Sequence, residues 1–197
     1  MSEKFSINIR ESLEHRKCLI SENIDYISES IVNIADHVVD SIKNSNKLLF
    51  CGNGGSAAES QHMAAEYCAT LDHSKPRDGM AAIALTTDTS FITAWGNDFG
   101  YDGIFERQLK TIGQKGDLLF AYSTSGNSKN VCLAAEYAIE HDIKVIALTG
   151  NHKNMRLEKY ANFTFKAPSE NTPNIQEIHT IVGHEVCLLV EKKLFDF

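Results

Sequence analysis

The sequence predicts an α/β fold in which a parallel β-sheet is flanked by helices, and three observations support this prediction. Short apolar runs of a length suited to buried strands alternate with longer segments of helical periodicity. At 197 residues the chain is long enough for one such domain and short for two. Hydrophobic residues make up 43% and charged residues 23%, as in ordinary globular proteins. Alternating strands and helices imply parallel βαβ units with helices on both faces.

The first expected element is a helical arm over residues 1–45. Its apolar residues recur at intervals of three and four, with polar residues between them: Ile20, Ile24, Ile27, Ile31, Ile34, Val38 and Ile42. This narrow stripe is close to a coiled-coil seam. It could pack on the chain's own sheet, but a long and even seam is also typical of a subunit interface in a helix bundle. We therefore expect the arm to form a homo-oligomer contact.

Residues 46–197 are expected to form a single domain, because no linker or internal repeat divides them. The apolar runs predict five strands, at 47–51, 81–85, 117–123, 144–149 and 163–167. Helices are expected at 56–71, 89–95, 103–112 and 128–141, with a weaker one near 154–160. The last helix is expected to begin near Thr172-Pro173, where Thr caps and Pro occupies the first turn, and to end about Leu194.

Composition and charge disfavour several classes of function. The net charge of -7 argues against a nucleic-acid-binding surface, since phosphate backbones select basic patches. No apolar segment of a signal peptide precedes the domain, and no run approaches the ~20 residues of a membrane span. Five cysteines without a CxxC pair are expected to be reduced thiols. We expect a cytoplasmic protein with no nucleic acid or membrane partner, although local N–H and hydroxyl donors can still bind a small phosphorylated substrate.

Two glycine-bearing turns follow expected strands and begin expected helices. They are Gly52-Asn53-Gly54-Gly55-Ser56 and Ser123-Thr124-Ser125-Gly126-Asn127-Ser128. In a parallel sheet both lie at the carboxyl edge, where ligands bind in open α/β folds. The first lacks the G-x-G-x-x-G spacing of a dinucleotide site, and the second resembles a hydroxyl-and-amide cradle for phosphate. Either one alone could be an ordinary turn or surface loop, but the two together predict a ligand site.

Histidine and carboxylate side chains add a second signal. His62 and Glu66 are four residues apart, so one helix face presents both, to a metal ion or as an acid and a base. Such pairs are also common on exposed helices without any function. The last helix carries Gln176 and His184, and the apolar neighbours of His184 leave open a core histidine bonded to a backbone carbonyl.

Four sequence blocks together resemble the phosphoheptose isomerases of the sugar isomerase (SIS) domain superfamily. They are CGNGGSAAESQHMAAE, TTDTSFITAWGNDFGYDGIFERQ, STSGNS and TPNIQEIHTIVGHEV, within about residues 45–195. The resemblance implies a flavodoxin-like five-stranded parallel sheet and a homotetramer with active sites at subunit contacts. It also implies conversion of sedoheptulose 7-phosphate into D-glycero-D-manno-heptose 7-phosphate through an enediol. This reaction is the first step toward the heptose of bacterial lipopolysaccharide and other surface glycans.

The resemblance also implies roles for individual residues. Glu66 and His184 match the catalytic acid–base positions of the family. Zinc (Zn²⁺) ligands reported for some members match His62, Glu66, Gln176 and His184. Substrate contacts are implied for Asn53, Gly54, Gly55, Glu66, Asn97, Asp98, Ser123, Thr124, Ser125, Ser128 and Gln176.

The spacing of two expected ligands bears on how the site is assembled. Gln176 and His184 are eight residues apart on one helix, about 12 Å along its axis. Two such side chains barely meet on one ion at zinc–ligand distances of about 2 Å. We therefore expect a site that is either stretched along this helix or built from more than one subunit.

Two other functions remain as alternatives. Some SIS paralogues bind the bacterial replication initiator DnaA and tend to lack the carboxylate and the histidine at the positions of Glu66 and His184, both of which this chain has. SIS regulators that sense sugar phosphates are usually joined to a DNA-binding domain, and no helix-turn-helix segment or basic arm occurs here.

Overall fold

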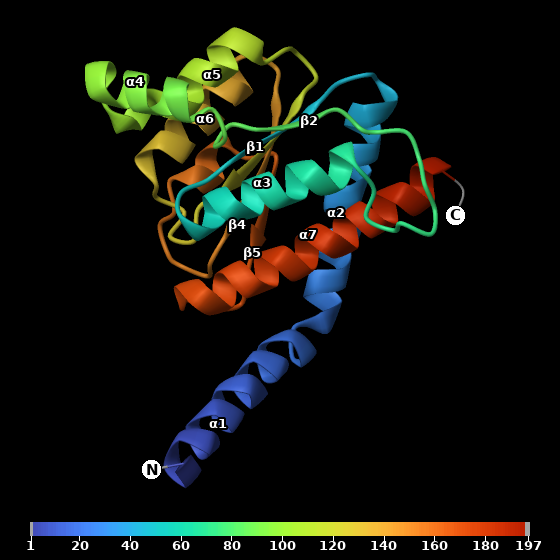
Figure 1. Cartoon of the computed structure of the whole chain (residues 1–197), viewed down its shortest axis with the longest axis vertical. Helices are drawn as coiled ribbons and strands as arrows, with labels where there is room; N and C mark the ends of the chain where they lie inside the picture. The colour runs from blue at the N-terminus through green and yellow to red at the C-terminus, as the bar shows by residue number, and fades with distance from the viewer. Residues whose placement is uncertain (1, 196–197) are drawn as a thin grey trace.

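The computed structural model describes residues 2–195, with side chains from residue 8 onward, and confirms the α/β fold with a five-stranded parallel sheet (Figure 1). The strands lie in the order β2-β1-β3-β4-β5, and every neighbouring pair is parallel. This is the flavodoxin-like order. Each predicted apolar run contains one strand: β1 (Leu48–Cys51), β2 (Ala82–Ala84), β3 (Leu118–Tyr122), β4 (Lys144–Thr149) and β5 (Phe163–Lys166).

Helices cover both faces of the sheet and so create two hydrophobic cores. Successive strand residues point to opposite faces, so Leu48 and Phe50 of β1 enter one core while Leu49 and Cys51 enter the other. The first core is covered by α2 (Ile24–Lys43), α3 (Gly55–Cys68) and α7 (Thr172–Phe195). The second is covered mainly by α5 (Ile104–Ile112) and α6 (Lys129–Glu140). Burial on both sides explains why the strands are continuous apolar runs.

The expected N-terminal arm consists of two helices with different surroundings. α1 (Ser2–Ser21) extends away from the body of the molecule, whereas α2 packs on the sheet beside α7 (Figure 1). The helix is interrupted at Glu22 and Asn23, so the first residue of the isoleucine stripe, Ile20, lies on α1 and the others lie on α2. Ile34 and Val38 are fully buried within this chain. That part of the stripe therefore completes the chain's own core, and the expected subunit contact remains a prediction for the surface left exposed.

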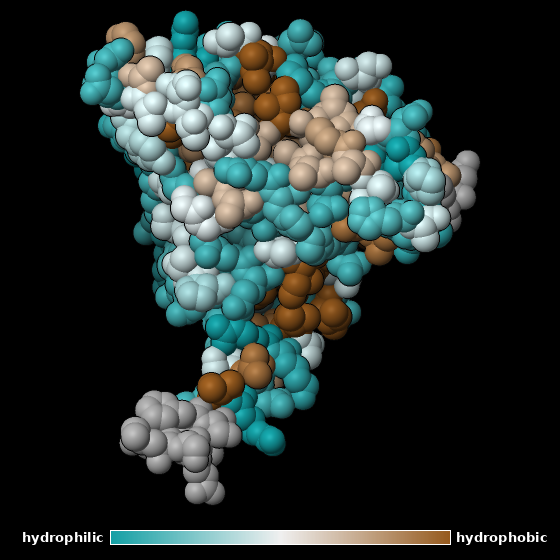
Figure 2. All heavy atoms as spheres, in the orientation of Figure 1, coloured by the Kyte–Doolittle hydropathy of each residue, from teal (hydrophilic) through white to brown (hydrophobic). Residues whose placement is uncertain are grey.

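Part of the exposed apolar surface lies on α1 and where α1 leaves the body. Figure 2 shows hydrophobic side chains on α1 and beside the place where it meets the rest of the molecule. Ile9 and Leu13 of α1 are 60% and 61% exposed. Nearby, a cavity of about 140 Å³ is lined by Leu19 and Ile20 on one side and Ile178 and Ile181 of α7 on the other.

Several helix boundaries differ from the prediction. α3 ends at Cys68 instead of continuing to residue 71, and α4 (Thr89–Phe99) is one turn longer than expected. The helix expected near 154–160 is reduced to the short 3-10 helix η2 (Leu157–Tyr160), because Asn154 takes a positive φ of 57° and interrupts any longer helix. A second 3-10 turn, η1 (Tyr101–Gly103), joins α4 to α5.

The sequence predicts no membrane-spanning helix and reduced cysteines. Within residues 2–195, no helix combines the length and the apolar character needed to cross a bilayer. All five cysteines are free thiols; Cys51, Cys132 and Cys187 are buried in the two cores.

Candidate active site and metal centre

Three of the expected site residues converge between α3 and α7. The Nε2 atoms of His62 and His184 are 2.7 Å apart, and Nδ1 of His62 lies 3.8 Å from Oε1 of Glu66. One potential ligand atom from each of the three residues lies within 4.8 Å of the others. The pair predicted from i,i+4 spacing on α3 is thus joined by the histidine on α7.

A glycine lies where the two helices pack against each other. Gly183 precedes His184 on α7, and a Cβ atom added there would lie 2.7 Å from Sδ of Met63 on α3. Met63 and Val182 belong to the same buried core, so apolar packing holds the helices together at this point. Gly183 thus leaves room between α3 and α7 for the side chain of Met63.

The three side chains fit a divalent metal ion chemically. Two imidazole nitrogens and one carboxylate oxygen form a donor set used by catalytic zinc sites, which keep a further position for water or substrate. Nitrogens bound to one tetrahedral zinc ion lie about 3.3 Å apart, so the His62–His184 pair needs only a small separation to admit an ion. All three ligands come from one chain.

Gln176, the fourth expected ligand, lies at the glycine turn, and its role as a ligand stays a prediction. Its side-chain amide lies against Gly55, where an added Cβ atom would be 2.5 Å from Nε2. Among the described residues it makes no hydrogen bond with His62, Glu66 or His184. The eight-residue spacing along α7 keeps Gln176 near the glycine turn, as the helical rise requires.

A cavity of about 260 Å³ lies between the two helices beside this cluster. Gly55 and Glu59 of α3 line one side, and Gln176, His179 and Thr180 of α7 line the other. Its walls therefore carry an acid, an amide, a hydroxyl and an imidazole. Such a mixture suits a ligand rich in hydroxyl groups.

Glu59 is a site residue that the sequence reasoning missed. Its Oε2 accepts a hydrogen bond of 2.7 Å from Thr180, while its Oε1 is buried without a partner among the described residues. Burial raises the pKa of Glu59, whereas the Thr180 hydrogen bond and the nearby His62 and His184 lower it. The signal was present: Glu59 stands three residues before His62, on the same helix face as Glu66.

The buried histidine of α7 is His179 rather than His184, so the core-histidine alternative for His184 is wrong. His184 is only half-buried, whereas His179 is 1% exposed and its Nε2 donates to the carbonyl oxygen of Thr149 at 3.1 Å. Burial lowers the pKa of His179 to about 4, although this hydrogen bond raises it. His179 is therefore neutral at pH 7 and serves the core.

The glycine turn places Asn53 in a network that fixes its amide. Gly54 has φ of 56° and ψ of -120°, a conformation that favours glycine. The side chains of Asn53 and Asn130 exchange two hydrogen bonds of 2.9 Å, and the Tyr101 hydroxyl donates a third to Oδ1 of Asn53. Asn130 and Tyr101 were not predicted, because only tertiary folding brings them to this turn.

The serine-rich loop is closed by its own hydrogen bonds. Ser123 Oγ donates to Ser128 Oγ at 3.0 Å, and the backbone N–H of Asn127 donates to Ser125 Oγ at 3.2 Å. Gly126 has φ of 65° and packs against Met155, so it also requires glycine. The loop ends at the N-terminus of α6, where free N–H groups and the helix dipole favour an anion.

Asn97 and Asp98 stand four and three residues before Tyr101, whose hydroxyl donates to Asn53 of the glycine turn. Both are exposed near the end of α4, where Asn97 Nδ2 donates to Asp98 Oδ1 at 2.8 Å. Among the described residues, neither has a hydrogen bond to the glycine turn, the serine loop or the His62–Glu66–His184 cluster. Their expected contact with substrate stays a prediction.

Comparisons of the sequence and of the structure with known proteins all indicate the same family. The SIS domain family model matches residues 14–150. The phosphoheptose isomerase of Akkermansia muciniphila is 44% identical, over 87% of this chain and 98% of that protein. The phosphoheptose isomerase of Aliarcobacter butzleri is 42% identical, over 94% of this chain and 96% of that protein. The solved phosphoheptose isomerase of Francisella tularensis matches with a TM-score of 0.88 and 33% identity, over 98% of this chain and all of that one (100%).

Proposed function

This chain belongs to the SIS domain family and to its phosphoheptose isomerases, and from that membership we propose that it converts sedoheptulose 7-phosphate into D-glycero-D-manno-heptose 7-phosphate. The structural observation that supports the proposal is the convergence of His62, Glu66 and His184 beside a polar cavity. A carboxylate and an imidazole within reach of one ligand are what an aldose–ketose isomerisation needs.

Glu66 is the proposed base for the carbon-bound proton. It would remove a proton from C1 of the ketose to give the enediol and then return a proton to C2, which yields the aldose. Its carboxylate is half-buried at the edge of the cluster, so it is accessible to a ligand while its position on α3 is fixed. A carboxylate can perform both transfers because the same group is a base in one step and an acid in the next.

His184 is the proposed carrier of the oxygen-bound protons. The isomerisation also moves a proton from the O1 hydroxyl to O2, and an imidazole can accept and donate near neutral pH. His62 lies next to it and orients the ring through the 2.7 Å contact between their Nε2 atoms. The two histidines and Glu66 would also hold the metal ion, for which we propose zinc. When bound, such an ion polarises the sugar carbonyl.

Substrate binding is assigned to the two glycine-bearing turns. The serine loop with Ser123, Thr124, Ser125 and Ser128 would hold the phosphate, since it combines hydroxyl groups with the N-terminus of α6. Asn53, Gly54, Gly55 and Gln176 would contact the sugar hydroxyls at the start of α3. Asn53 has Oδ1 occupied by Asn130 and Tyr101, so it would present an N–H donor.

We further propose a homotetramer in which neighbouring chains complete each site. Asn97 and Asp98 are exposed near the end of α4, so their side chains can contact substrate in a site that a neighbouring chain completes. The exposed apolar residues of α1 are a suitable subunit contact. The relatives reported above carry the isomerase name, which gives no support to the DnaA-binding alternative.

Incubation of the purified protein with sedoheptulose 7-phosphate in D₂O tests the proposal. The expected product is the aldoheptose phosphate with deuterium at C2, because the proton removed by Glu66 exchanges with solvent during the enediol stage. NMR detects both the product and the label. Product without deuterium would mean that the C1 proton passes to C2 without exchange with solvent, and the absence of both product and exchange would contradict the isomerase assignment.

A further inference from the structure

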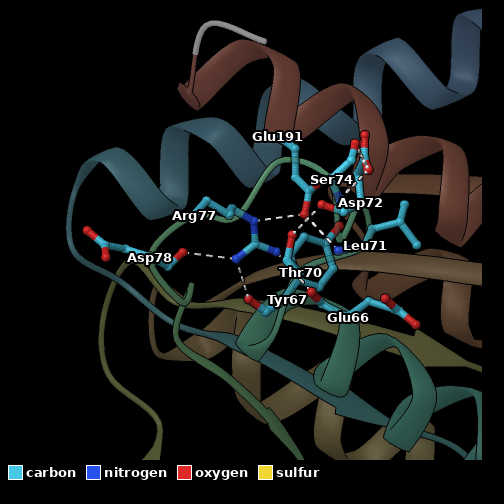
Figure 3. A network of polar contacts seen from close by, with 9 residues as sticks. All are labelled: Glu66, Tyr67, Thr70, Leu71, Asp72, Ser74, Arg77, Asp78 and Glu191. Carbon is cyan, nitrogen blue, oxygen red and sulfur yellow. Dashed lines mark hydrogen bonds and ion pairs between the residues drawn. The ribbon is translucent and has the colours of Figure 1, made fainter.

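A buried arginine lies behind the cluster, in the loop that joins α3 to β2. The side chain of Arg77 is 0% exposed and that of Glu191 is 1% exposed, and Nε of Arg77 lies 2.8 Å from Oε1 of Glu191 (Figure 3). Nη2 of Arg77 donates to the backbone carbonyl of Glu66 at 2.9 Å. Nη1 donates to the carbonyls of Tyr67 and Asp78, both at 3.0 Å.

The carbonyls of Glu66 and Tyr67 belong to the last turn of α3, where helix geometry leaves the acceptors without partners inside the helix. A cation is also favoured at this end of a helix, because the dipole is negative there. Arg77 therefore caps α3 at the residue that carries the proposed base. The hydrogen bond from Arg77 fixes the backbone of Glu66, while the carboxylate of Glu66 lies in the cluster beside His62.

Glu191 links the same arginine to the other helix of the site. It lies on α7 seven residues after His184, and residues spaced by seven lie on the same helix face. Oε1 of Glu191 also accepts the backbone N–H of Leu71 at 3.0 Å, just beyond the end of α3. The Arg77–Glu191 pair thus bridges the two helices that supply His62, Glu66 and His184.

We propose that Arg77 and Glu191 are positioning residues that set the geometry of Glu66 relative to His184. This inference rests on the proposed function, since it assigns the pair a role in the isomerase site. A buried ion pair with no such role is weak evidence for stability, because apolar side chains often replace one without loss. The two backbone hydrogen bonds at Glu66 and Tyr67 give this pair a specific geometric effect on the site.

The experiment compares Arg77→Met and Arg77→Lys with Lys47→Met as a matched control. Lys47 and Asp117 form a similarly enclosed pair, 2.6 Å apart with side chains 17% and 1% exposed. That pair lies at the amino ends of β1 and β3, at the opposite edge of the sheet from the site. For each variant, thermal unfolding, Co²⁺ affinity by absorption titration, kcat and KM are measured.

Arg77→Met is expected to lower Co²⁺ affinity and kcat by about 10- to 100-fold, the usual effect of losing a residue that orients metal ligands, with KM changed far less. Arg77→Lys keeps the charge beside Glu191 but lacks the planar fork that places separate nitrogens on Glu191, Tyr67 and Glu66, so its losses should be intermediate. Lys47→Met should keep wild-type affinity and kcat despite a comparable loss of thermal stability.

Four results separate failure of the inference from failure of the variant or of the proposed function. Wild-type Co²⁺ affinity and kcat in a folded Arg77 variant would overturn the inference, and so would equal losses in Lys47→Met. If Arg77→Met does not fold, the same comparison is made with Arg77→Lys. If the wild-type protein is inactive on the sugar phosphate, the proposed function fails, while the Co²⁺ titration still tests the bridge between the helices.

Discussion

The Nε2 atoms of His62 and His184 lie 2.7 Å apart, although 122 positions separate the two residues in the sequence. At this distance the two nitrogens share one hydrogen, because two N–H groups facing each other would repel. A metal ion that took the place of this hydrogen would need both rings neutral. Proton and metal therefore compete for the same pair of nitrogens, and metal affinity should fall in acid.

Glu66→Gln and His184→Ala are each expected to lower kcat by about 10²- to 10⁴-fold, because each removes a group that transfers a proton. Size-exclusion chromatography should show an unchanged oligomer, because neither substitution touches the exposed apolar residues of α1 that form the proposed subunit contact. The exposed neighbour Glu185 supplies a control, since Glu185→Gln should keep the wild-type rate. Near wild-type rates in both site variants would refute the catalytic assignment.

Exhaustive chelation is expected to remove most isomerase activity, and added zinc should restore it, because His62, Glu66 and His184 present a suitable donor set. Metal content of the protein as purified and after restoration gives the stoichiometry, expected at one ion per chain. Full activity in metal-free protein would exclude the ion from the reaction and leave the three residues with acid–base roles alone.

Asn130→Leu is expected to raise KM for the sugar phosphate by about 5- to 10-fold, which corresponds to the loss of roughly one hydrogen bond. The reason is that Asn130 holds the Asn53 amide through two hydrogen bonds. Tyr101→Phe removes only one partner of Asn53, so its effect should be smaller. A Tyr101→Phe effect larger than that of Asn130→Leu would mean that Tyr101 contacts substrate directly.

His179 is expected to make the protein less stable in mild acid. Its pKa is lowered from 6.5 to about 4 in the folded protein, so the unfolded chain binds the proton more readily in this interval. Stability is therefore present above pH 6.5 and is lost as the pH falls towards 4, by about 1 kcal/mol at pH 5.5. Urea unfolding of wild type and His179→Gln at fixed protein concentration measures this. Equal pH dependence in both proteins would disprove it.

The fold was predictable because each strand is buried on both faces and so appears as an uninterrupted apolar run. The isoleucine stripe shows the limit of this reasoning. A stripe that packs on its own sheet and one that packs on another subunit bury the same residues, so Ile34 and Val38 gave no sign of which surface they meet.

Prediction of the site depended on how local each relationship is. His62 and Glu66 are one helical turn apart, so their spacing alone placed them together. His184 joined them through the family resemblance, and its contact with His62 depends on how α3 packs against α7. Arg77 and Asn130 act through backbone or side-chain contacts with distant residues, and such contacts leave no periodic pattern in the sequence.

Gly183 leaves space that two flexible side chains of α3 occupy. Alanine is favoured over glycine within a helix by about 1 kcal/mol, so Gly183→Ala should strengthen α7 considered alone. The added methyl group would lie 2.7 Å from Sδ of Met63 and 3.2 Å from Oε1 of Glu59, and both atoms stand at the far ends of flexible side chains. Those side chains, rather than the helices, would give way. The substitution would therefore change the surroundings of Glu59 while α7 and His184 keep their places.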